Sequence, residues 1–499
     1  MIDLATESRP EVLRQVALLQ QRENEMLHAR ITQLASELAR VRGEDATAAL
    51  QLELMRLQEQ LAAAQQRLFG RSSERRPLHS AEPTPPPAAA RTGHGPRSQP
   101  TLPIVEVVHT LDVPDQGCTV CGGAIEEMAG QFEESQEIDV VAASYRIVQH
   151  RRQKYRCRCG GCVETALGPP KIIPGGRYSI DFCVHVAVSK YLDHLPLARQ
   201  VRQMARAGLT IDTQTLWDQL LALSRHLVPS YEALHRFVLE ARVIGADETT
   251  WPLLEKGGSK RWYAWSAARE GAVVYRIAAS RSAEAARGLL RDYAGVVMCD
   301  GYAAYGTLAR APGGGGFTRA HCWSHVRRKF LEAEPAHPEA QRGVAWIGEL
   351  YDVERDVEKA EVLDPAAHRL RLRQERSRPI VEALRAWITT VPSLPQSSLG
   401  KALAYTETLW PGLVRFLDDP AIPLDNNATE RALRGVVLGR KNHYGSKSQR
   451  GTEVAALFYS LLESAKLSGL EPARYLAEAT RRALANPGTA TLPRDLLPA

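Results

Sequence analysis

The sequence predicts a multidomain α+β protein, and three observations support this fold class. The chain has 499 residues, which is more than one hydrophobic core usually contains. Its composition changes along its length, from a leucine-rich arm to a proline-rich stretch, a group of cysteines and a helical region. After residue 240, short apolar strands alternate with helices, which indicates a mixed sheet covered by helices.

Residues 1–76 are predicted to form a helical arm. Heptad spacing relates two groups of apolar residues, which are Leu27, Ile31, Leu34, Leu38 and Val41, and then Leu54, Leu57, Leu61, Ala64 and Leu68. Such spacing is typical of a coiled coil that would make the protein at least a dimer, although a single amphipathic helix packed on another domain would show it too. The arm ends in LFGRSSERR, where Arg71 and Arg75 are candidate DNA contacts.

Residues 77–104 read as a linker, because PTPPPAAA and its surroundings contain too few apolar side chains to fold. Residues 105–167 are predicted to form a zinc-binding domain. Its candidate ligands are two C-x2-C pairs, Cys118 with Cys121 and Cys159 with Cys162, while Cys157 competes for the third position. Four thiolates form a tetrahedral site for one structural Zn²⁺, whereas the alternative is a set of redox-inert cysteines. The basic run between the pairs supplies Arg151 and Arg152 as candidate DNA contacts.

Residues 168–240 change to helical periodicity. One helix is expected to end near Gly208, and a second to begin at Thr213 with Asp212 or Thr213 as its cap. This arrangement is typical of a helix-turn-helix that binds DNA through its second helix, although any helical hairpin would look similar.

Residues 241–460 are predicted to form a ribonuclease H-like catalytic core. Three antiparallel strands, a helix that begins after Ser282 and a fourth strand follow one another, with Asp247 and Glu248 on the first strand and Asp300 at the end of the fourth. In that fold the first and fourth strands are neighbours, so Asp247 and Asp300 would face the same point. Two adjacent carboxylates repel, and a pair of Mg²⁺ or Mn²⁺ ions about 4 Å apart would remove the conflict. Gly301 would let a phosphate approach the backbone closely.

A third acid completes such a site, and Glu430 in LDNNATERALRG is the best candidate. Glu430 could instead form a capping box with Asn427, and Asp425 is a rival acid. Basic side chains follow Glu430 as they would in a DNA groove, and three of them are candidate DNA contacts: Arg431, Arg434 and Lys441.

A helical insertion is expected over about residues 335–420, because the chain between Asp300 and Glu430 is much longer than a usual connection between two secondary-structure elements. Before it, HCWSHVRRKF reads as the last strand and its helix, and Arg327 and Arg328 are candidate DNA contacts. His321, Cys322 and His325 could be zinc ligands, but no fourth partner lies nearby in the sequence, so packing or DNA contact is the favoured interpretation. Residues 461–499 read as a C-terminal helical tail.

The distribution of apolar residues and cysteines indicates the cellular compartment of the protein. No apolar stretch reaches the roughly 20 residues of a membrane span, and the N-terminus lacks the apolar region of a secretory signal. We therefore expect a cytoplasmic protein without a membrane partner. In that reducing compartment, eight cysteines indicate metal binding rather than disulfides.

Together these motifs resemble transposases of the insertion-sequence-sixty-six (IS66) type. The shared segments, in order, are LFGRSSERR, the paired cysteines, YLDHLPLARQ, ADETTWP, CDGYAAYG, AHCWSHVRRKF, LDNNATERALR and LEPARYL. The resemblance implies a DDE catalytic triad at Asp247, Asp300 and Glu430, a zinc-binding domain, and a bacterial, nucleoid-associated enzyme that cuts element ends and joins them to target DNA. Accessory transposition proteins are partners that the resemblance also implies.

Two other functions are compatible with the same motifs. One is a sequence-specific DNA-binding regulator whose acids are structural, and the other is a nuclease or junction resolvase that lacks strand transfer. Transposition is favoured because three acids coincide with several DNA-binding segments.

Overall fold

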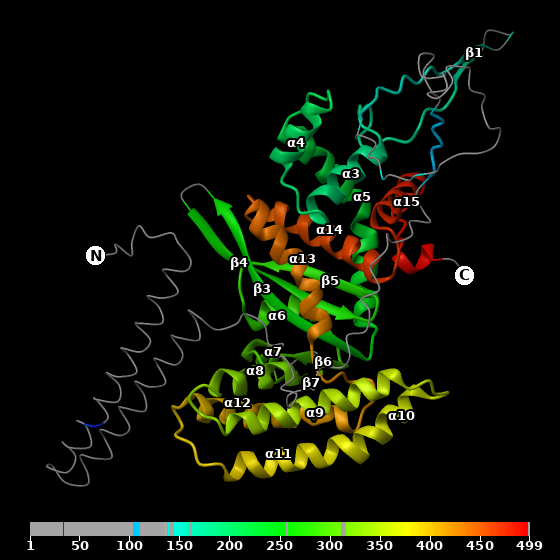
Figure 1. Ribbon diagram of the computed structural model, residues 1–499. Coiled ribbons are helices and arrows are strands. Elements are labelled where there is room, and N and C mark those ends of the chain that lie inside the picture. The colour runs from blue at the N-terminus through cyan, green and yellow to red at the C-terminus, as the bar shows by residue number, and fades with distance from the viewer. Residues whose placement is uncertain are drawn as a thin grey trace, which may run out of the picture. The chain divides into compact units, whose positions relative to one another are not determined.

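The computed structural model describes residues 144–156 and 162–497, apart from 256, 257 and 311–315, together with 33, 103–109, 135, 138 and 158. The chain divides into a compact unit that contains Tyr145–Ala499 and a second unit, Ser73–Ser144. All helices and strands named below belong to the first unit (Figure 1). The predicted coiled coil and linker lie outside the described residues, apart from Gln33 and residues 103 and 104.

A five-stranded mixed sheet is the centre of this unit. Its strands are β3 (Val243–Glu255), β4 (Gly258–Arg269), β5 (Ala272–Ala278), β6 (Val296–Cys299) and β7 (Thr318–His321). The order across the sheet is β5-β4-β3-β6-β7, with antiparallel pairs from β5 to β3 and parallel pairs from β3 to β7. The structure therefore confirms that the first and fourth strands of the sheet are neighbours. A separate two-stranded hairpin joins β1 (Lys154–Arg156) to β2 (Val163–Thr165).

Helices surround the sheet and account for most of the described chain. They are α3 (Ile180–Tyr191), α4 (Leu197–Arg206), α5 (Thr213–Leu239), α6 (Ala283–Leu290), α7 (Ala303–Arg310), α8 (Trp323–Ala333), α9 (Ala340–Lys359), α10 (Pro365–Leu372), α11 (Arg378–Thr390), α12 (Ser398–Leu413), α13 (Asn427–His443), α14 (Gln449–Leu467) and α15 (Pro472–Ala485). Short turns of other helix types lie at η2 (Arg373–Ser377), η3 (Arg415–Leu417) and η4 (Pro493–Leu496).

The helix-turn-helix pattern corresponds to α4, a turn and α5. Gly208 adopts φ +83°, a backbone conformation that glycine reaches without steric cost. Asp212 begins α5 by accepting a hydrogen bond from the Thr215 backbone N–H at 2.7 Å. The cap that the sequence left open between Asp212 and Thr213 is therefore Asp212.

Serine side chains of α14 satisfy the free edge of the sheet at β5. Ser464 Oγ accepts a hydrogen bond from the Val273 N–H at 3.0 Å and donates one to the Val273 carbonyl at 2.8 Å. Ser460 Oγ accepts one from the Tyr275 N–H at 2.8 Å. An edge strand otherwise presents unpaired backbone groups, and the two serines of α14 supply hydrogen bonds that a sixth strand would make. The domain boundary predicted at residue 460 falls inside this helix.

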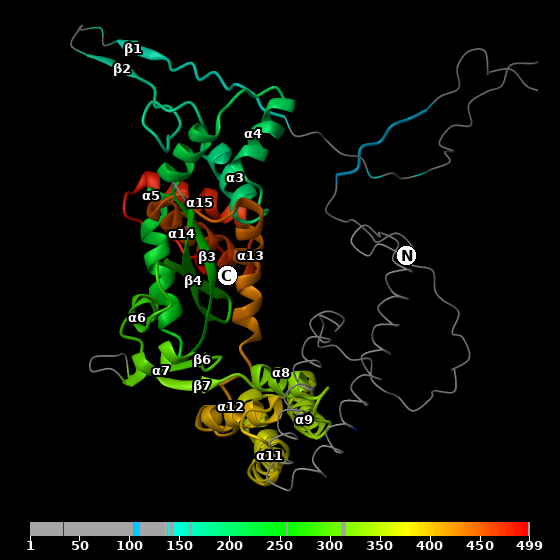
Figure 2. The same cartoon turned by 90° about the vertical axis from the view of Figure 1, so that its left-hand side faces the viewer.

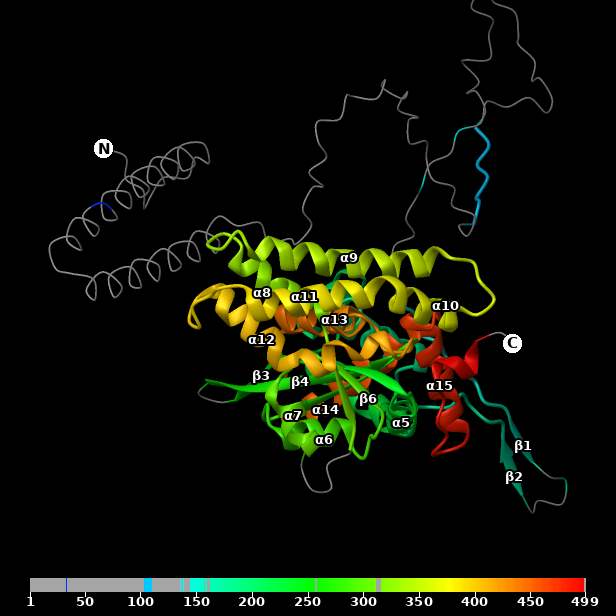
Figure 3. The same ribbon diagram turned by 90° about the horizontal axis from the view of Figure 1, so that it is seen from below.

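The inserted residues form a helical layer with its own apolar core. This core contains Trp323, Phe330, Ile347 and Leu384 from α8, α9 and α11, and it also takes in Met298 of β6. Strand alternation separates the two faces of β6, because Val297 and Cys299 belong to the larger core on the other face. Figure 1 shows α8 to α12 gathered at the β6–β7 end of the unit, and Figure 3 shows α9 and α11 side by side.

Arg373 is a buried cation inside the insertion. Its guanidinium pairs with both carboxylate oxygens of Glu354, at 2.7 and 2.8 Å, and donates to the carbonyl groups of Phe416, Asp419 and Ile422. A buried charge is tolerated when it is paired and fully hydrogen-bonded in this way. The ion pair ties the turn after α10 to α9, and the hydrogen bonds to the three carbonyl groups tie it to the segment that leads back to the sheet. Among the described helices, none combines the length and apolar character that crossing a bilayer requires.

Candidate active site

Asp247 and Asp300 extend the same ends of two adjacent strands. The parallel pairing of β3 with β6 ends at Gly245 opposite Met298; Asp247 lies two residues further along β3, and Asp300 is the first residue after β6. Side chains two residues apart on a strand point to the same face. Both residues therefore lie at the carboxyl end of the parallel pair, and the charge of Asp300 acts on the Asp247 carboxyl.

Local contacts fix the turn that carries Asp300. Its Oδ1 accepts a hydrogen bond from the Tyr302 N–H at 2.8 Å, and its carbonyl accepts one from the Tyr405 hydroxyl of α12 at 2.5 Å. Gly301 has φ +89°, and a Cβ there would lie 2.6 Å from a methyl group of Leu409. Glycine is therefore required by the backbone conformation and by the helix packed against the turn.

The beginning of α13 brings Glu430 to the same place. Asn426 donates from Nδ2 to the Ala246 carbonyl at 2.9 Å, which attaches the helix start to the centre of β3. A Cβ on Gly245 would lie only 1.9 Å from Thr429 Oγ1, so this close approach depends on the glycine. Figure 2 shows α13 running alongside the sheet.

The electrostatic environment of Asp247 includes the other two predicted acids. The pKa of Asp247 is raised to about 7, first because the carboxyl is buried and then because Glu248, Asp300 and Glu430 place negative charge near it. A hydrogen bond from the Glu248 N–H to Asp247 Oδ1, at 2.8 Å, opposes the shift only in part. Segments far apart in the sequence thus form one cluster of carboxylates.

Glu248 is a fourth carboxylate, to which the sequence analysis assigns no role. Its side chain is only 1% exposed, and it forms an ion pair with Arg281. The Tyr305 hydroxyl donates to its other oxygen at 3.0 Å. Burial raises the pKa of Glu248, while Arg281 lowers it. Arg281 also stacks 3.8 Å over the Tyr302 ring, so this network braces the turn after Asp300.

Asp425, the rival of Glu430, is occupied by structural hydrogen bonds. It accepts from the Asn427 N–H at 2.9 Å and from the Tyr351 hydroxyl of α9 at 2.9 Å. The N-cap residue of α13 is Asn426 rather than Asn427, and the Glu430 N–H donates to the Asn426 carbonyl at 3.1 Å, so the capping box considered for Asn427 and Glu430 does not form. Glu430 is therefore left available for another role.

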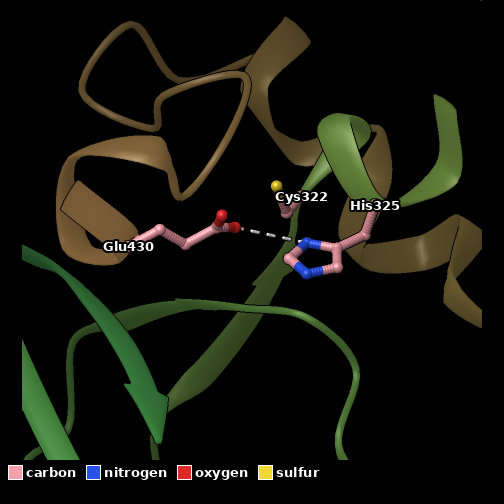
Figure 4. Close-up of side chains that lie close together, drawn as sticks. All are labelled: Cys322, His325 and Glu430. Carbon is pink, nitrogen blue, oxygen red and sulfur yellow. Dashed lines mark ion pairs between the residues drawn. The ribbon is translucent and has the colours of Figure 1, made fainter. Parts of the chain in front are cut away.

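Cys322, His325 and Glu430 converge at the start of α8 (Figure 4). A ligand atom from each lies within 4.8 Å of the others, and Glu430 Oε1 is 3.7 Å from His325 Nδ1. His321 does not join them. It is buried beside Gly412, and burial, with Arg319, lowers its pKa to about 4. Neutral His321 therefore packs, which is one of the interpretations left open by the sequence.

The basic side chains of α13 lie on its solvent side. Arg431, Arg434 and Lys441 are exposed and recur on one helical face. Arg440, by contrast, turns toward β3 and donates to Thr249 Oγ1 at 3.0 Å and Thr250 Oγ1 at 2.6 Å. The three predicted contact residues thus form an exposed basic stripe next to the carboxylates, which we call the α13 stripe.

The other predicted DNA contacts have mixed settings. Arg327 and Arg328 are half-buried on α8. Arg151 and Arg152 are exposed, and Arg152 Nε donates to the Ala166 carbonyl at 2.6 Å, which joins the two arms of the β1–β2 hairpin.

Most residues of the predicted zinc site fall outside the described part of the chain. These are Cys118, Cys121, Cys157 and Cys159, and the same holds for Arg71 and Arg75. Cys162 is described and is an exposed free thiol.

Known proteins and protein families are similar in sequence to most of this chain. The profile of the family described as "Transposase IS66 family" matches residues 175–454, and the one described as "zinc-finger binding domain of transposase IS66" matches residues 115–160. The second match includes Cys157 and Cys159 and ends before Cys162. It supports a structural zinc in this region.

Two relatives come from Sinorhizobium fredii (strain NBRC 101917 / NGR234). The "Uncharacterized protein y4jD" is 34% identical over 416 residues, which cover 80% of each chain. The "Uncharacterized protein y4qI" is 32% identical over 402 residues, which cover 76% of this chain and 72% of the relative. The extent of the first profile match decides the assignment: the chain belongs to the IS66 family of transposases.

Proposed function

We propose that the protein is a metal-dependent DNA transposase with a ribonuclease H-like core, in which Asp247, Asp300 and Glu430 are the catalytic acids. Two observations support this proposal: the parallel register sets Asp247 and Asp300 at the same end of β3 and β6, and burial together with the charges of Glu248, Asp300 and Glu430 raises the pKa of Asp247 to about 7. A purely structural set of acids would be paired with permanent cations. Glu248 has such a partner in Arg281 and Glu430 lies 3.7 Å from the imidazole of His325, whereas Asp247 and Asp300 form no ion pair among the described residues. Unpaired clusters of this kind are typical of functional sites.

The donor set fits a hard divalent cation. All three side chains offer carboxylate oxygens, which Mg²⁺ and Mn²⁺ prefer. Glu430 Oε1 is buried and has no hydrogen-bond partner among the described residues. When bound, two such ions supply activation of the attacking hydroxyl and stabilisation of the leaving oxygen in phosphoryl transfer.

The protein's own residues prepare this site in three ways. The Tyr302 N–H donates to one oxygen of Asp300, which fixes the orientation of this carboxylate. Tyr405 fixes the carbonyl of Asp300 from the insertion, so the helical layer supports the position of the acid. The Glu248–Arg281 pair keeps a fourth negative charge balanced beside the site. In the proposed reaction, water first frees a 3′ hydroxyl at the element end, and that hydroxyl then attacks target DNA.

DNA binding is assigned to several basic segments. The α13 stripe lies beside the acids and suits the strand that is cut. The helix-turn-helix of α4 and α5, the zinc domain with Arg151 and Arg152, and the arm with Arg71 and Arg75 would bind the terminal repeats of the element. The zinc domain would hold one ion through Cys118, Cys121, Cys159 and Cys162, with Cys157 as the alternative ligand. A coiled coil over residues 1–76 would hold two ends together.

A cleavage and joining assay tests the proposal. Full-length protein is incubated with linear element-end DNA and a plasmid target, with and without Mg²⁺. We expect joined products with the wild type. Asp300→Asn should lower the cleavage rate at least about a hundredfold, or about 2.7 kcal/mol of transition-state stabilisation, while DNA binding is retained. Asp292→Asn, an exposed aspartate before β6, is the matched control and should cleave normally.

The outcomes separate the three candidate functions. Undiminished cleavage by Asp300→Asn would remove this residue from the mechanism. Cleavage without joined products would indicate a nuclease or resolvase. Tight binding without any metal-dependent cleavage would indicate a DNA-binding regulator.

A further inference from the structure

The group of Cys322, His325 and Glu430 differs in chemistry from the carboxylate site next to it. It offers one sulfur, one imidazole nitrogen and one carboxylate oxygen, all within 4.8 Å of one another. Tetrahedral zinc sites use these three ligand types, with bonds of about 2.0 to 2.3 Å, whereas Mg²⁺ selects oxygen ligands. Small side-chain rotations would bring the three atoms to the shorter separations that one ion requires.

The backbone around Cys322 is arranged for a thiolate. Cys322 is the N-cap residue of α8, so its sulfur lies at the positive end of the helix dipole. The Asn426 N–H donates to Sγ at 3.2 Å, and the N–H of His325 also stabilises the charged form. Without a metal ion, burial and then the charges of Asp425 and Glu430 outweigh these hydrogen bonds and raise the pKa of the thiol to about 12, whereas a coordinated metal ion deprotonates a thiol outright.

The facing atoms of His325 and Glu430 lack hydrogen-bond partners. His325 Nδ1 and Glu430 Oε1 are both buried and unpartnered among the described residues. Their separation of 3.7 Å is longer than a hydrogen bond. Figure 4 shows the two side chains pointing toward each other, with the sulfur of Cys322 beside them. Buried polar atoms are nearly always satisfied, and a cation bound between these two side chains would satisfy both.

We propose that Cys322, His325 and Glu430 bind one thiophilic divalent cation, with the properties of Zn²⁺, at a site that shares only Glu430 with the magnesium site. Three protein ligands leave a fourth position open for water. Because Glu430 belongs to both sites, zinc binding withdraws it from Asp247 and Asp300 and inhibits DNA cleavage. This inhibition rests on the proposed function, but the binding of the ion does not.

Cobalt binding tests the site without reference to activity. Reduced full-length protein is first given one equivalent of zinc, which the four-cysteine site binds more tightly than three mixed ligands do, and is then titrated with Co²⁺. A thiolate ligand gives a sulfur-to-cobalt charge-transfer band, which carboxylate ligands cannot produce. We expect this band with one further Co²⁺ per chain. Cys322→Ser should abolish it, and His325→Gln should weaken Co²⁺ binding at least about tenfold.

Cys299→Ser is the matched control, because Cys299 is a buried thiol at the end of β6 that lies outside the cluster. It should leave the band unchanged. Thermal unfolding of each variant shows whether it folds, and His325→Gln keeps the test decisive if Cys322→Ser does not. A band that is absent from the wild type, or that survives both Cys322→Ser and His325→Gln, would overturn the site.

A second measurement tests the sharing of Glu430. The cleavage rate with saturating Mg²⁺ is compared with and without Zn²⁺ at concentrations that displace Co²⁺. We expect Zn²⁺ to lower the cleavage rate of the wild type at least about tenfold. In Cys322→Ser, the cleavage rates with and without Zn²⁺ should be nearly equal. Zinc binding without inhibition would overturn the shared role of Glu430 and leave the site standing. A protein that never cleaves DNA would contradict the proposed function, while the cobalt result would still hold.

Discussion

At the scale of single residues, Asp247 holds a charge that the fold disfavours. Its side chain is largely buried among Glu248, Asp300 and Glu430, and its pKa rises from 3.8 to about 7. Below about pH 4 the carboxyl is protonated in both the folded and the unfolded chain. Between about pH 4 and 7 the unfolded chain releases this proton while the folded protein keeps it. Stability therefore falls as pH rises through this window, and the loss is complete above about pH 7.

Asp247→Asn should remove this loss. In metal-free protein, we expect the variant's Tm to exceed the wild-type Tm by more at about pH 8 than at about pH 5, because only the wild type must bury an ionised carboxylate. Differential scanning calorimetry measures both values. Added Mg²⁺ should reduce the difference at about pH 8, because the ion stabilises only a protein that binds it. An equal difference at both pH values would contradict the raised pKa.

The choice between Glu430 and Asp425 shows where residue-level prediction ends. Both acids stand at the start of one helix, and local sequence cannot separate them. The difference lies in Tyr351 of α9, whose hydroxyl occupies Asp425, and in Asn426, which attaches the helix to β3. The partner of Glu248 could not be predicted either, because Arg281 stands on a different element and meets Glu248 only after the sheet forms.

At the scale of elements, the contact between β3 and α13 positions the third acid. Gly245→Ala would place a methyl group 1.9 Å from Thr429 Oγ1 and 2.4 Å from Asn426 Oδ1. The helix start must then move away from the strand. We expect a loss of about 1–3 kcal/mol of stability and a larger loss of cleavage activity than of DNA binding.

Gly348→Ala on α9 is the control for this substitution. A Cβ at Gly348 has no heavy atom within 4 Å among the described residues, so the change should stabilise the protein by about 0.5–1 kcal/mol through helix propensity. Chemical denaturation and the cleavage assay measure both variants. Full activity in Gly245→Ala would show that the position of Glu430 does not depend on this contact.

The α13 stripe should contribute to DNA affinity through phosphate charge. Replacing Arg434 or Lys441 by alanine should weaken binding to any sequence and reduce the slope of log K against log salt by about 1 for each lost contact. Fluorescence anisotropy at several salt concentrations measures the slope. Lys359→Ala, an exposed lysine at the end of α9, should leave the slope unchanged. An unchanged slope in the two stripe variants would exclude this face from the DNA interface.

Periodicity predicted these elements well where the pattern was local. The strand alternation of the core, the Ser282 and Asp212 caps and the helical insertion all follow from short-range sequence. The role of the insertion could not be predicted from short-range sequence. Its helices cover one face of β6 and β7, and Tyr405 contacts the backbone of Asp300, which only tertiary packing reveals.

At the scale of the whole molecule, the zinc domain should bind its ion independently of the catalytic unit. We expect reduced protein, dialysed without added metal, to retain about one zinc per chain by elemental analysis, because four cysteine ligands bind much more tightly than three mixed ligands. Cys118→Ser should lose this zinc, and a comparison of Cys157→Ser with Cys162→Ser identifies the second pair. Retention of zinc by Cys118→Ser would contradict the ligand set.

The central claim is that Asp247, Asp300 and Glu430 together bind the catalytic metal ions. Anomalous diffraction from crystals of the protein with Mn²⁺ and element-end DNA tests it most directly. The account predicts two peaks about 4 Å apart, with all three carboxylates in coordinating positions around them. Peaks elsewhere, or Glu430 still turned toward His325 and beyond reach of either ion, would contradict it.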